Sequence, residues 1–266
     1  MHEIADIACN FTIERFDNDL GKVVDKAIAN KISKFGLICS RLSDIDKLLG
    51  IYNQYSSNMF FTIGVHPHHA NEINNEYLTK LKEIINKNEP HAIGETGLDF
   101  FRNLSTYEEQ IFAFEEQIKI SIDTNKPLFL HQRDSHDDFI KILRKYSSDI
   151  DKAVVHCFTG TQAQLDDYLE LDAYIGLTGW ICDEKRNVDL RKTIKNIPLS
   201  KLMIETDCPY LIPKDLPDKP KNNRNEPSYL NHIVREIATV MEVEEEMLRK
   251  KSFENTLDFF DIKTLL

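Results

Sequence analysis

Features that would direct the chain to a membrane or to secretion are missing from the sequence. No apolar run approaches the roughly 20 residues that a membrane-spanning helix needs. The amino-terminal segment MHEIADIACN has no basic stretch followed by an apolar core, so no secretory signal is expected. The five cysteines are odd in number, far apart and without CxxC spacing, which argues against a disulfide framework. We therefore expect a cytoplasmic protein with no membrane partner.

A surplus of basic residues is also missing, since the formal net charge is -11. This charge argues against a broad basic patch of the kind that binds long nucleic acids. It does not exclude an enzyme that holds one phosphate with a metal ion and a few local arginines. Such an enzyme would bind long polyanions weakly and locally, and nothing in the sequence implies an obligate protein partner.

The sequence has no Pro/Gly/Ser-rich linker in its middle, and 41% of its residues are hydrophobic. We therefore expect one domain spanning residues 1–266. The polar stretch Pro213–Pro227, with its four prolines, is interpreted as a loop over one end of this domain. The first connections between predicted elements contain neither GxGxxG nor GxxxxGK[ST], so neither phosphate-binding loop is indicated.

Short apolar runs alternate with amphipathic segments along most of the chain. The predicted strands are Ile4–Cys9, Phe35–Cys39, Met59–Val65, Ala92–Gly94, Pro127–Leu130, Ala153–Val155, Tyr174–Leu177 and Leu202–Ile204. Helices are predicted at Leu20–Ile32, Leu42–Tyr55, Asp137–Tyr146, Gln162–Leu171, Val188–Ile197 and Glu244–Phe259. Apolar faces mark three further helices, around residues 78–85, 111–122 and 230–237.

About eight strands alternating with helices imply a parallel sheet, and eight is the number that closes into a barrel. The predicted fold is therefore an α/β TIM (β/α)8 barrel. A doubly wound open sheet is the alternative. The absence of both phosphate-binding loops weighs against that alternative.

Five side chains of the metal-ligating types sit where predicted strands end: His66, Glu95, His131, His156 and Asp207. In a closed barrel these strand ends share one rim, so the five residues would converge on one pocket. Imidazole and carboxylate groups are ligands of Zn, Mn, Mg and Fe, so the sequence predicts a metal site at this rim.

Two neighbours of these residues leave alternatives open. Arg133, two positions past His131, would either meet a substrate phosphate or pair with Asp134 or Asp137. Asp207 is preferred to Glu205, because strand alternation puts both on one side with Asp207 nearer the rim.

Seven motifs occur in order along the chain: VHPH (65–68), AIGETGLDF (92–100), LHQRDSH (130–136), VVHCFTG (154–160), YIGLTGW (174–180), LMIETDCPYL (202–211) and RNEP (224–227). Together they closely resemble the TatD family of metal-dependent deoxyribonucleases. The resemblance implies an amidohydrolase-like TIM barrel that uses a divalent cation to remove nucleotides from DNA, with RNA as a further candidate substrate.

The same resemblance assigns roles to individual residues. It implies that Glu95, His131 and His156 are metal ligands, that Asp207 is a ligand or general base, and that His66 is a catalytic or phosphate-facing residue. Arg133 and the RNEP residues Arg224, Asn225 and Glu226 are the expected substrate-binding residues.

The chain departs from the family pattern at one place. Many members have a His-x-His pair after the first strand, whereas this chain has Asn10-Phe11-Thr12. Asn and Thr are poor ligands beside imidazole, which argues against a permanent second metal at this position. The Asn-x-Thr form resembles the exonuclease branch of the family, which leans toward Mg²⁺. Mn²⁺ and Zn²⁺ are the alternatives, because histidine ligands are unusual for Mg²⁺.

The predicted activity is metal-dependent hydrolysis of phosphodiester bonds by a 3'-5' exonuclease on single-stranded DNA, serving DNA repair or nucleic-acid turnover. Phe101, Trp180 and Tyr210 would stack on bases, or else pack between loops and helices. The same metal site would also suit an amidohydrolase or an aminoacyl-tRNA deacylase. A non-catalytic metal-binding protein is the third alternative.

Overall fold

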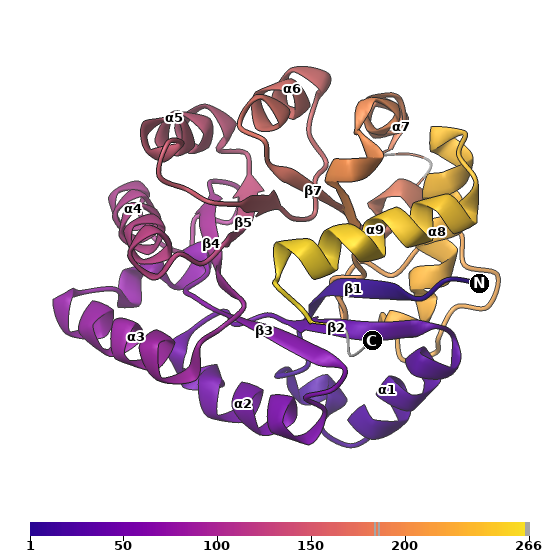
Figure 1. Ribbon diagram of the computed structural model, residues 1–266, viewed down its shortest axis with the longest axis horizontal. Coiled ribbons are helices and arrows are strands. Elements are labelled where there is room, and N and C mark those ends of the chain that lie inside the picture. Colours follow the sequence, from indigo (N-terminus) through magenta and orange to yellow (C-terminus); the bar gives the residue numbers. More distant parts are fainter. Residues whose placement is uncertain (184, 186, 264–266) are drawn as a thin grey trace.

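The computed structural model describes residues 1–183, 185 and 187–263. Its parallel strands follow one another in chain order around a barrel, and helices cover the outside (Figure 1). The strands are β1 (Ile4–Cys9), β2 (Ile32–Leu37), β3 (Met59–Ile63), β4 (Ala92–Asp99), β5 (Leu128–Arg133), β6 (Ala153–Val155), β7 (Tyr174–Leu177) and β8 (Leu202–Ile204). The main helices are α1 (Leu20–Ala29), α2 (Ile45–Gln54), α3 (Asn75–Asn88), α4 (Tyr107–Thr124), α5 (His136–Tyr146), α6 (Gln162–Glu170), α7 (Val188–Thr193), α8 (Leu230–Met241) and α9 (Glu245–Phe259).

The first and last strands meet at a seam made largely by side chains. Cys9 forms an isolated parallel bridge with Cys208. Asp6, which is fully buried in β1, accepts hydrogen bonds from the backbone N–H and the hydroxyl of Thr206, at 2.8 and 2.5 Å. These contacts bring β8 back to β1. The predicted TIM barrel is confirmed, and the open sheet is excluded.

Large apolar side chains fill the barrel at the end where the strands begin. They form a separate cluster with members from each strand or its immediate end: Ile7, Ala8, Ile38, Phe60, Ala92, Phe129, Val154, Tyr174 and Met203. Phe259 and Phe260, at the end of α9, complete this cluster. Their rings lie 5.4 Å from Tyr174 and 4.3 Å from Phe60, respectively. Helix α9 therefore closes this end of the barrel, and the opposite rim is left for a site (Figure 1).

Several predicted boundaries are corrected by local backbone geometry. The first helix ends at Ala29 rather than Ile32, because Lys31 adopts a left-handed conformation with φ of 66° and β2 begins at the next residue. β4 runs through Glu95 to Asp99 instead of ending at Gly94. β5 likewise continues through His131 to Arg133. The predicted helix Val188–Ile197 is shorter, since α7 ends at Thr193 and a 3-10 turn follows.

Within the described part of the chain, no helix is both long and apolar enough to cross a membrane.

Helix α4 begins with a capping box. The Thr106 hydroxyl accepts a hydrogen bond from the Glu109 N–H, and the Glu109 carboxylate accepts one from the Thr106 N–H. This reciprocal pair satisfies two donors at the start of a helix that packs against β4, the strand that carries Glu95.

Candidate active site

Close contact between β4 and β5 sets the spacing of the central residues. Gly97 has φ of 145°, and a Cβ at this position would lie 1.9 Å from the His131 carbonyl oxygen. Only glycine fits both the backbone conformation and the short distance. The two strands can therefore approach closely where they carry Glu95 and His131 into the rim.

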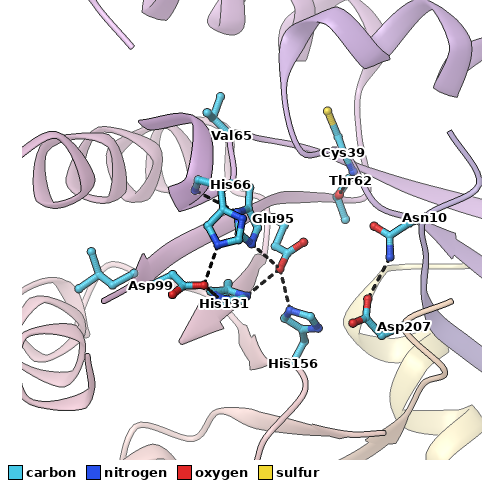
Figure 2. Close-up of polar contacts among 12 residues, drawn as sticks. Asn10, Cys39, Thr62, Val65, His66, Glu95, Asp99, His131, His156 and Asp207 are labelled. Carbon is cyan, nitrogen blue, oxygen red and sulfur yellow. Dashed lines mark hydrogen bonds and ion pairs between the residues drawn. The ribbon is translucent and has the colours of Figure 1, made fainter. Parts of the chain in front are cut away.

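Glu95 lies at the centre of the predicted cluster, with imidazoles around one oxygen (Figure 2). Its Oε1 is 2.7 Å from His156 Nε2, 3.0 Å from His131 Nδ1 and 3.4 Å from His66 Nε2. Glu95 is only 7% exposed. The structure therefore brings four of the five predicted rim residues into one contact network, although they come from separate strands or strand ends.

The charges of this network are strongly coupled. Burial opposes ionisation of Glu95, but the neighbouring His66 and His156 hold the pKa of its carboxyl well below the usual range. Burial also acts against charge on His131 and His156, yet the carboxylates beside them raise the pKa of both imidazoles. At His66 burial prevails and lowers the pKa to about 4. The site thus combines an ionised carboxylate with imidazoles that differ in their affinity for protons.

Asp99 and His68 also belong to this network, although the sequence analysis did not predict them as site residues. Asp99 Oδ2 lies 2.7 Å from His68 Nε2 and 3.2 Å from His131 Nε2. Asp99 is 1% exposed, and its hydrogen bonds with the two histidines keep the pKa of its carboxyl low despite burial. His68 lies in the motif VHPH and Asp99 in the motif AIGETGLDF. The sequence could have indicated both residues, because each is an ionisable group within a few positions of a predicted site residue.

Glu205 is a third residue that the sequence placed second to Asp207. It is fully buried, and its Oε1 accepts a hydrogen bond from the Cys157 N–H at 2.5 Å. Its Oε2 lies 3.5 Å from His156 Nδ1. The preference for Asp207 assumed that β8 continues to residue 207, but the strand ends at Ile204. Alternation therefore does not rank the two carboxylates, and both face the site from the segment after β8.

Asp207 occupies the side of the site beside His156, apart from the Glu95 network (Figure 2). Its backbone is left-handed, with φ of 55°. Its Oδ1 accepts a hydrogen bond from Asn10 Nδ2 at 2.9 Å, and Asn10 also donates to the Cys208 carbonyl oxygen at 3.1 Å. Burial raises the pKa of the Asp207 carboxyl to about 7, against the opposing charge of His156. Asn10, the departure from the family's His-x-His pair, thus orients Asp207.

The residues present fit a bound cation. His66, Glu95 and His131 offer ligand atoms that all lie within 4.8 Å of one another. Among the described residues, the buried His156 Nδ1 and Glu205 Oε2 have no hydrogen-bond partner. Imidazole nitrogens and carboxylate oxygens that converge on one buried place are characteristic of a metal centre. The rim therefore holds a candidate metal site built from histidine and glutamate.

Arg133 lies at the edge of the site and is exposed to solvent. Its guanidinium carbon is 3.9 Å from the centre of the Phe101 ring. Among the residues that the structure describes, no ion pair joins Arg133 to Asp134 or Asp137. Phe101 and Tyr210 are 55% and 53% exposed, whereas Trp180 is partly buried against the core. Two of the three candidate stacking residues therefore present open ring surface.

The RNEP residues hold the last loop against the barrel. Arg224 donates from both terminal nitrogens to the Asp19 carboxylate at 2.8 Å, and it also pairs with Glu226 at 2.8 Å. Asn225 Nδ2 donates to the Thr206 carbonyl oxygen at 3.0 Å. Arg224 and Asn225 are 6% and 0% exposed. These contacts hold the segment that carries Asp207 in place. Substrate binding by Arg224, Asn225 and Glu226 stays a prediction.

Comparison with known proteins gives consistent matches over nearly the whole chain. A family described as TatD related DNase matches residues 5–261. A protein of Pectobacterium atrosepticum named 3'-5' ssDNA/RNA exonuclease TatD is 42% identical over 233 residues, which are 88% of this chain and 90% of that protein.

Solved structures share the fold. The crystal structure of a TatD family hydrolase from Entamoeba histolytica is 28% identical, with a TM-score of 0.88 over 97% of this chain and 98% of that chain. A TatD homologue from Escherichia coli, YJJV, has a TM-score of 0.90 at 22% identity, covering 98% of both chains. The second likeness supports the barrel architecture alone.

Proposed function

The chain belongs to the TatD-related DNase family, and from this membership and the geometry of its rim we propose that it is a metal-dependent 3'-5' exonuclease. The proposed substrates are single-stranded DNA and RNA, the nucleic acids named for its relative from Pectobacterium. The observation that carries the proposal is the placement of His66, His131 and His156 around one oxygen of Glu95. We further propose DNA repair or nucleic-acid turnover as the setting.

Glu95, His131 and His156, joined by His66, would hold the cation. When bound, a divalent cation supplies a Lewis acid that polarises a phosphate oxygen and lowers the pKa of water toward neutrality. We propose Mg²⁺ as the ion. Mn²⁺ and Zn²⁺ are the alternatives, since imidazole nitrogen is a ligand that they take more readily.

The chain's own groups would orient the water and the phosphate. Asp207 would accept the proton of the attacking water, and the Asn10 amide donates a 2.9 Å hydrogen bond to one of its oxygens. Glu205 accepts a hydrogen bond from the Cys157 backbone N–H through Oε1, and its Oε2 faces His156 Nδ1, the ring nitrogen that points away from Glu95. Arg133 is exposed beside the rim, where its fixed positive charge would meet a phosphate of the strand.

The decisive test uses single-stranded DNA and RNA oligonucleotides labelled at either end. The protein is first treated with EDTA, and then Mg²⁺, Mn²⁺ or Zn²⁺ is added back separately. A 3'-5' exonuclease releases the 3' label at once as a mononucleotide and shortens 5'-labelled strands progressively. No digestion is expected while EDTA is present.

The matched control is Glu95→Gln, which keeps the shape of the central side chain and removes its charge. If the Glu95→Gln protein digested the oligonucleotides as fast as the wild type, the activity would come from a contaminating nuclease. A panel of small amides, esters and aminoacyl-tRNA is run in parallel. Cleavage of that panel with intact oligonucleotides would overturn the nuclease proposal in favour of an amidohydrolase or deacylase.

A further inference from the structure

A second group of metal-ligating side chains lies away from the site described above. It contains Cys182, Asp215 and His232, whose ligand atoms all lie within 4.8 Å of one another. Cys182 ends the 3-10 turn η4 (Gly179–Cys182), Asp215 belongs to the loop after β8, and His232 is in the first turn of α8. Three separate parts of the chain thus contribute a sulfur, an oxygen and a nitrogen to one place.

The backbone brings these parts together without help from the three side chains. The loop after β8 passes so close to η4 that a Cβ on Gly179 would lie 2.6 Å from the Leu211 carbonyl oxygen and 3.3 Å from the Pro213 ring. Glycine at position 179 permits this approach. Cys182 and Asp215 are therefore neighbours because of the fold itself.

The group is closed on its inner side and open on its outer side. Cys182 is only 2% exposed. His232 Nε2 and Asp215 Oδ1 lie 2.7 Å apart, and their side chains are 20% and 35% exposed. The sulfur is thus covered, whereas the carboxylate and the imidazole are partly open to solvent, so that water could serve as a further ligand.

The charged groups around the Cys182 thiol favour the binding of a cation. Burial, with Asp215 and Glu236 nearby, raises the pKa of Cys182. The neighbouring cation, Arg191, donates a hydrogen bond to Glu236, which lies one helical turn after His232. Its charge is therefore offset by Glu236, and a cation held by the three side chains themselves would stabilise a thiolate here.

We propose that Cys182, Asp215 and His232 form a second metal site, which binds Zn²⁺ with water as the fourth ligand. A mixed sulfur, nitrogen and oxygen set suits Zn²⁺, whereas Mg²⁺ and Ca²⁺ prefer oxygen ligands. On binding, the Cys182 sulfur exchanges its proton for the metal, and the proton passes to solvent. The ion would link η4 to α8 through the loop that leads to the RNEP segment, and this inference goes beyond the proposed nuclease activity.

The test uses Co²⁺ as a spectroscopic substitute for Zn²⁺ in the full-length protein after removal of metal with EDTA. Coordination of a thiolate to Co²⁺ gives a charge-transfer band in the near ultraviolet, and the Glu95 site has no sulfur among its proposed ligands. The band is expected in the wild type and should disappear when Zn²⁺ is added. It should be lost in Cys182→Ser.

Two controls separate this site from the first one. Cys157→Ser removes the thiol beside His156, and Glu95→Gln damages the first metal site. Both variants should keep the band, so the result does not depend on nuclease activity. Loss of the band in Cys157→Ser, or its survival in Cys182→Ser, would overturn the proposal, as would its absence from the wild type.

Because Cys182 is buried, Cys182→Ser is checked for folding by circular dichroism. Asp215→Ala and His232→Asn, at more exposed positions, provide the second measurement. Each should weaken Co²⁺ binding at the sulfur site by at least about tenfold. Unchanged affinity in both variants would contradict the proposed ligand set, whatever the outcome for Cys182→Ser.

Discussion

His156 Nδ1 and Glu205 Oε2 lie 3.5 Å apart in the interior, and neither atom has a hydrogen-bond partner in the described parts of the chain. The opposite nitrogen of His156 faces Glu95 Oε1 at 2.7 Å. A histidine that binds a metal through one nitrogen commonly donates from the other to a carboxylate. Glu205 is therefore placed to orient His156 as a ligand.

Glu205→Gln should weaken metal binding about 10-fold to 100-fold, because an amide is a weaker acceptor for the imidazole N–H. The affinity is measured by calorimetric titration of the metal-free protein. Glu254→Gln on α9 makes the same chemical change at a solvent-exposed ion pair with Lys251. Equal affinities in the two variants would remove the orienting role from Glu205.

Asp207→Asn should lower turnover about 100-fold to 10,000-fold, the range for loss of a general base, because an amide cannot accept the proton of water. Metal content should stay close to that of the wild type. Single-turnover digestion of a labelled oligonucleotide and metal analysis of the same sample measure the two quantities. A wild-type rate would rule out the base assignment, and loss of the metal together with activity would make Asp207 chiefly a ligand.

Asp6→Asn should change how stability depends on pH. Burial raises the pKa of Asp6 from 3.8 to about 7 in the folded protein. Between these values the folded chain keeps a proton that the unfolded chain has lost, so the free energy of unfolding falls as pH rises through this window. The asparagine variant is neutral throughout and should lack this contribution.

The measurement is urea unfolding of both proteins at several pH values between about 4 and 8, across the window set by the two pKa values. Other groups titrate alike in both chains and cancel in the difference. The variant should gain stability relative to the wild type as pH rises. A constant difference would show that Asp6 does not carry its proton at the seam between β1 and β8.

Phe260→Ala should destabilise the protein by about 3 to 5 kcal/mol, since it empties part of the plug at the base of the barrel. Phe260 is 1% exposed and packs against Phe60 and Phe259. Phe112→Ala on α4 is the control, because Phe112 is 44% exposed and its loss should cost less than about 1 kcal/mol. Chemical denaturation of both variants checks the contrast, which would vanish if α9 did not seal the barrel.

Arg133→Ala should weaken binding of single-stranded oligonucleotides regardless of sequence. If Arg133 neutralises one phosphate, the slope of log affinity against log salt should become shallower by about 0.7. Binding is measured with the Glu95→Gln protein as background, so that the strand stays intact. Lys250→Ala on α9 removes one positive charge near the closed end of the barrel and should leave the slope unchanged. A slope unaffected by Arg133→Ala would assign this residue to its contact with Phe101 alone.

The alternation of strands and helices was predictable because buried parallel strands are short apolar runs bounded by turns. β6, β7 and β8 have the predicted bounds. β4 was predicted too short, because its second half contains Glu95 and Asp99 and therefore lacks the apolar pattern of a buried strand. These side chains are buried beside imidazoles from other segments of the chain, and the sequence of a single strand does not contain that information.

The site was predictable for residues that follow apolar runs, and His66, Glu95, His131 and His156 do meet. Contacts between distant segments were not predictable. Arg224 illustrates this limit: the family resemblance assigned it to substrate binding, which stays a prediction, but nothing in the sequence indicated its pairing with Asp19, which is 205 residues away in the chain. Asn10 is similar, because its role depends on an Asp207 carboxylate that reaches it only when the barrel closes.

Phe259 and Phe260 cover one end of a barrel whose interior is already filled by side chains from each of its strands or their immediate ends. The proposed exonuclease would therefore take up a strand at the rim that carries Glu95, because the packed interior leaves no room for the strand to pass through the barrel. Each released nucleotide must also leave by the same rim before the shortened strand can advance.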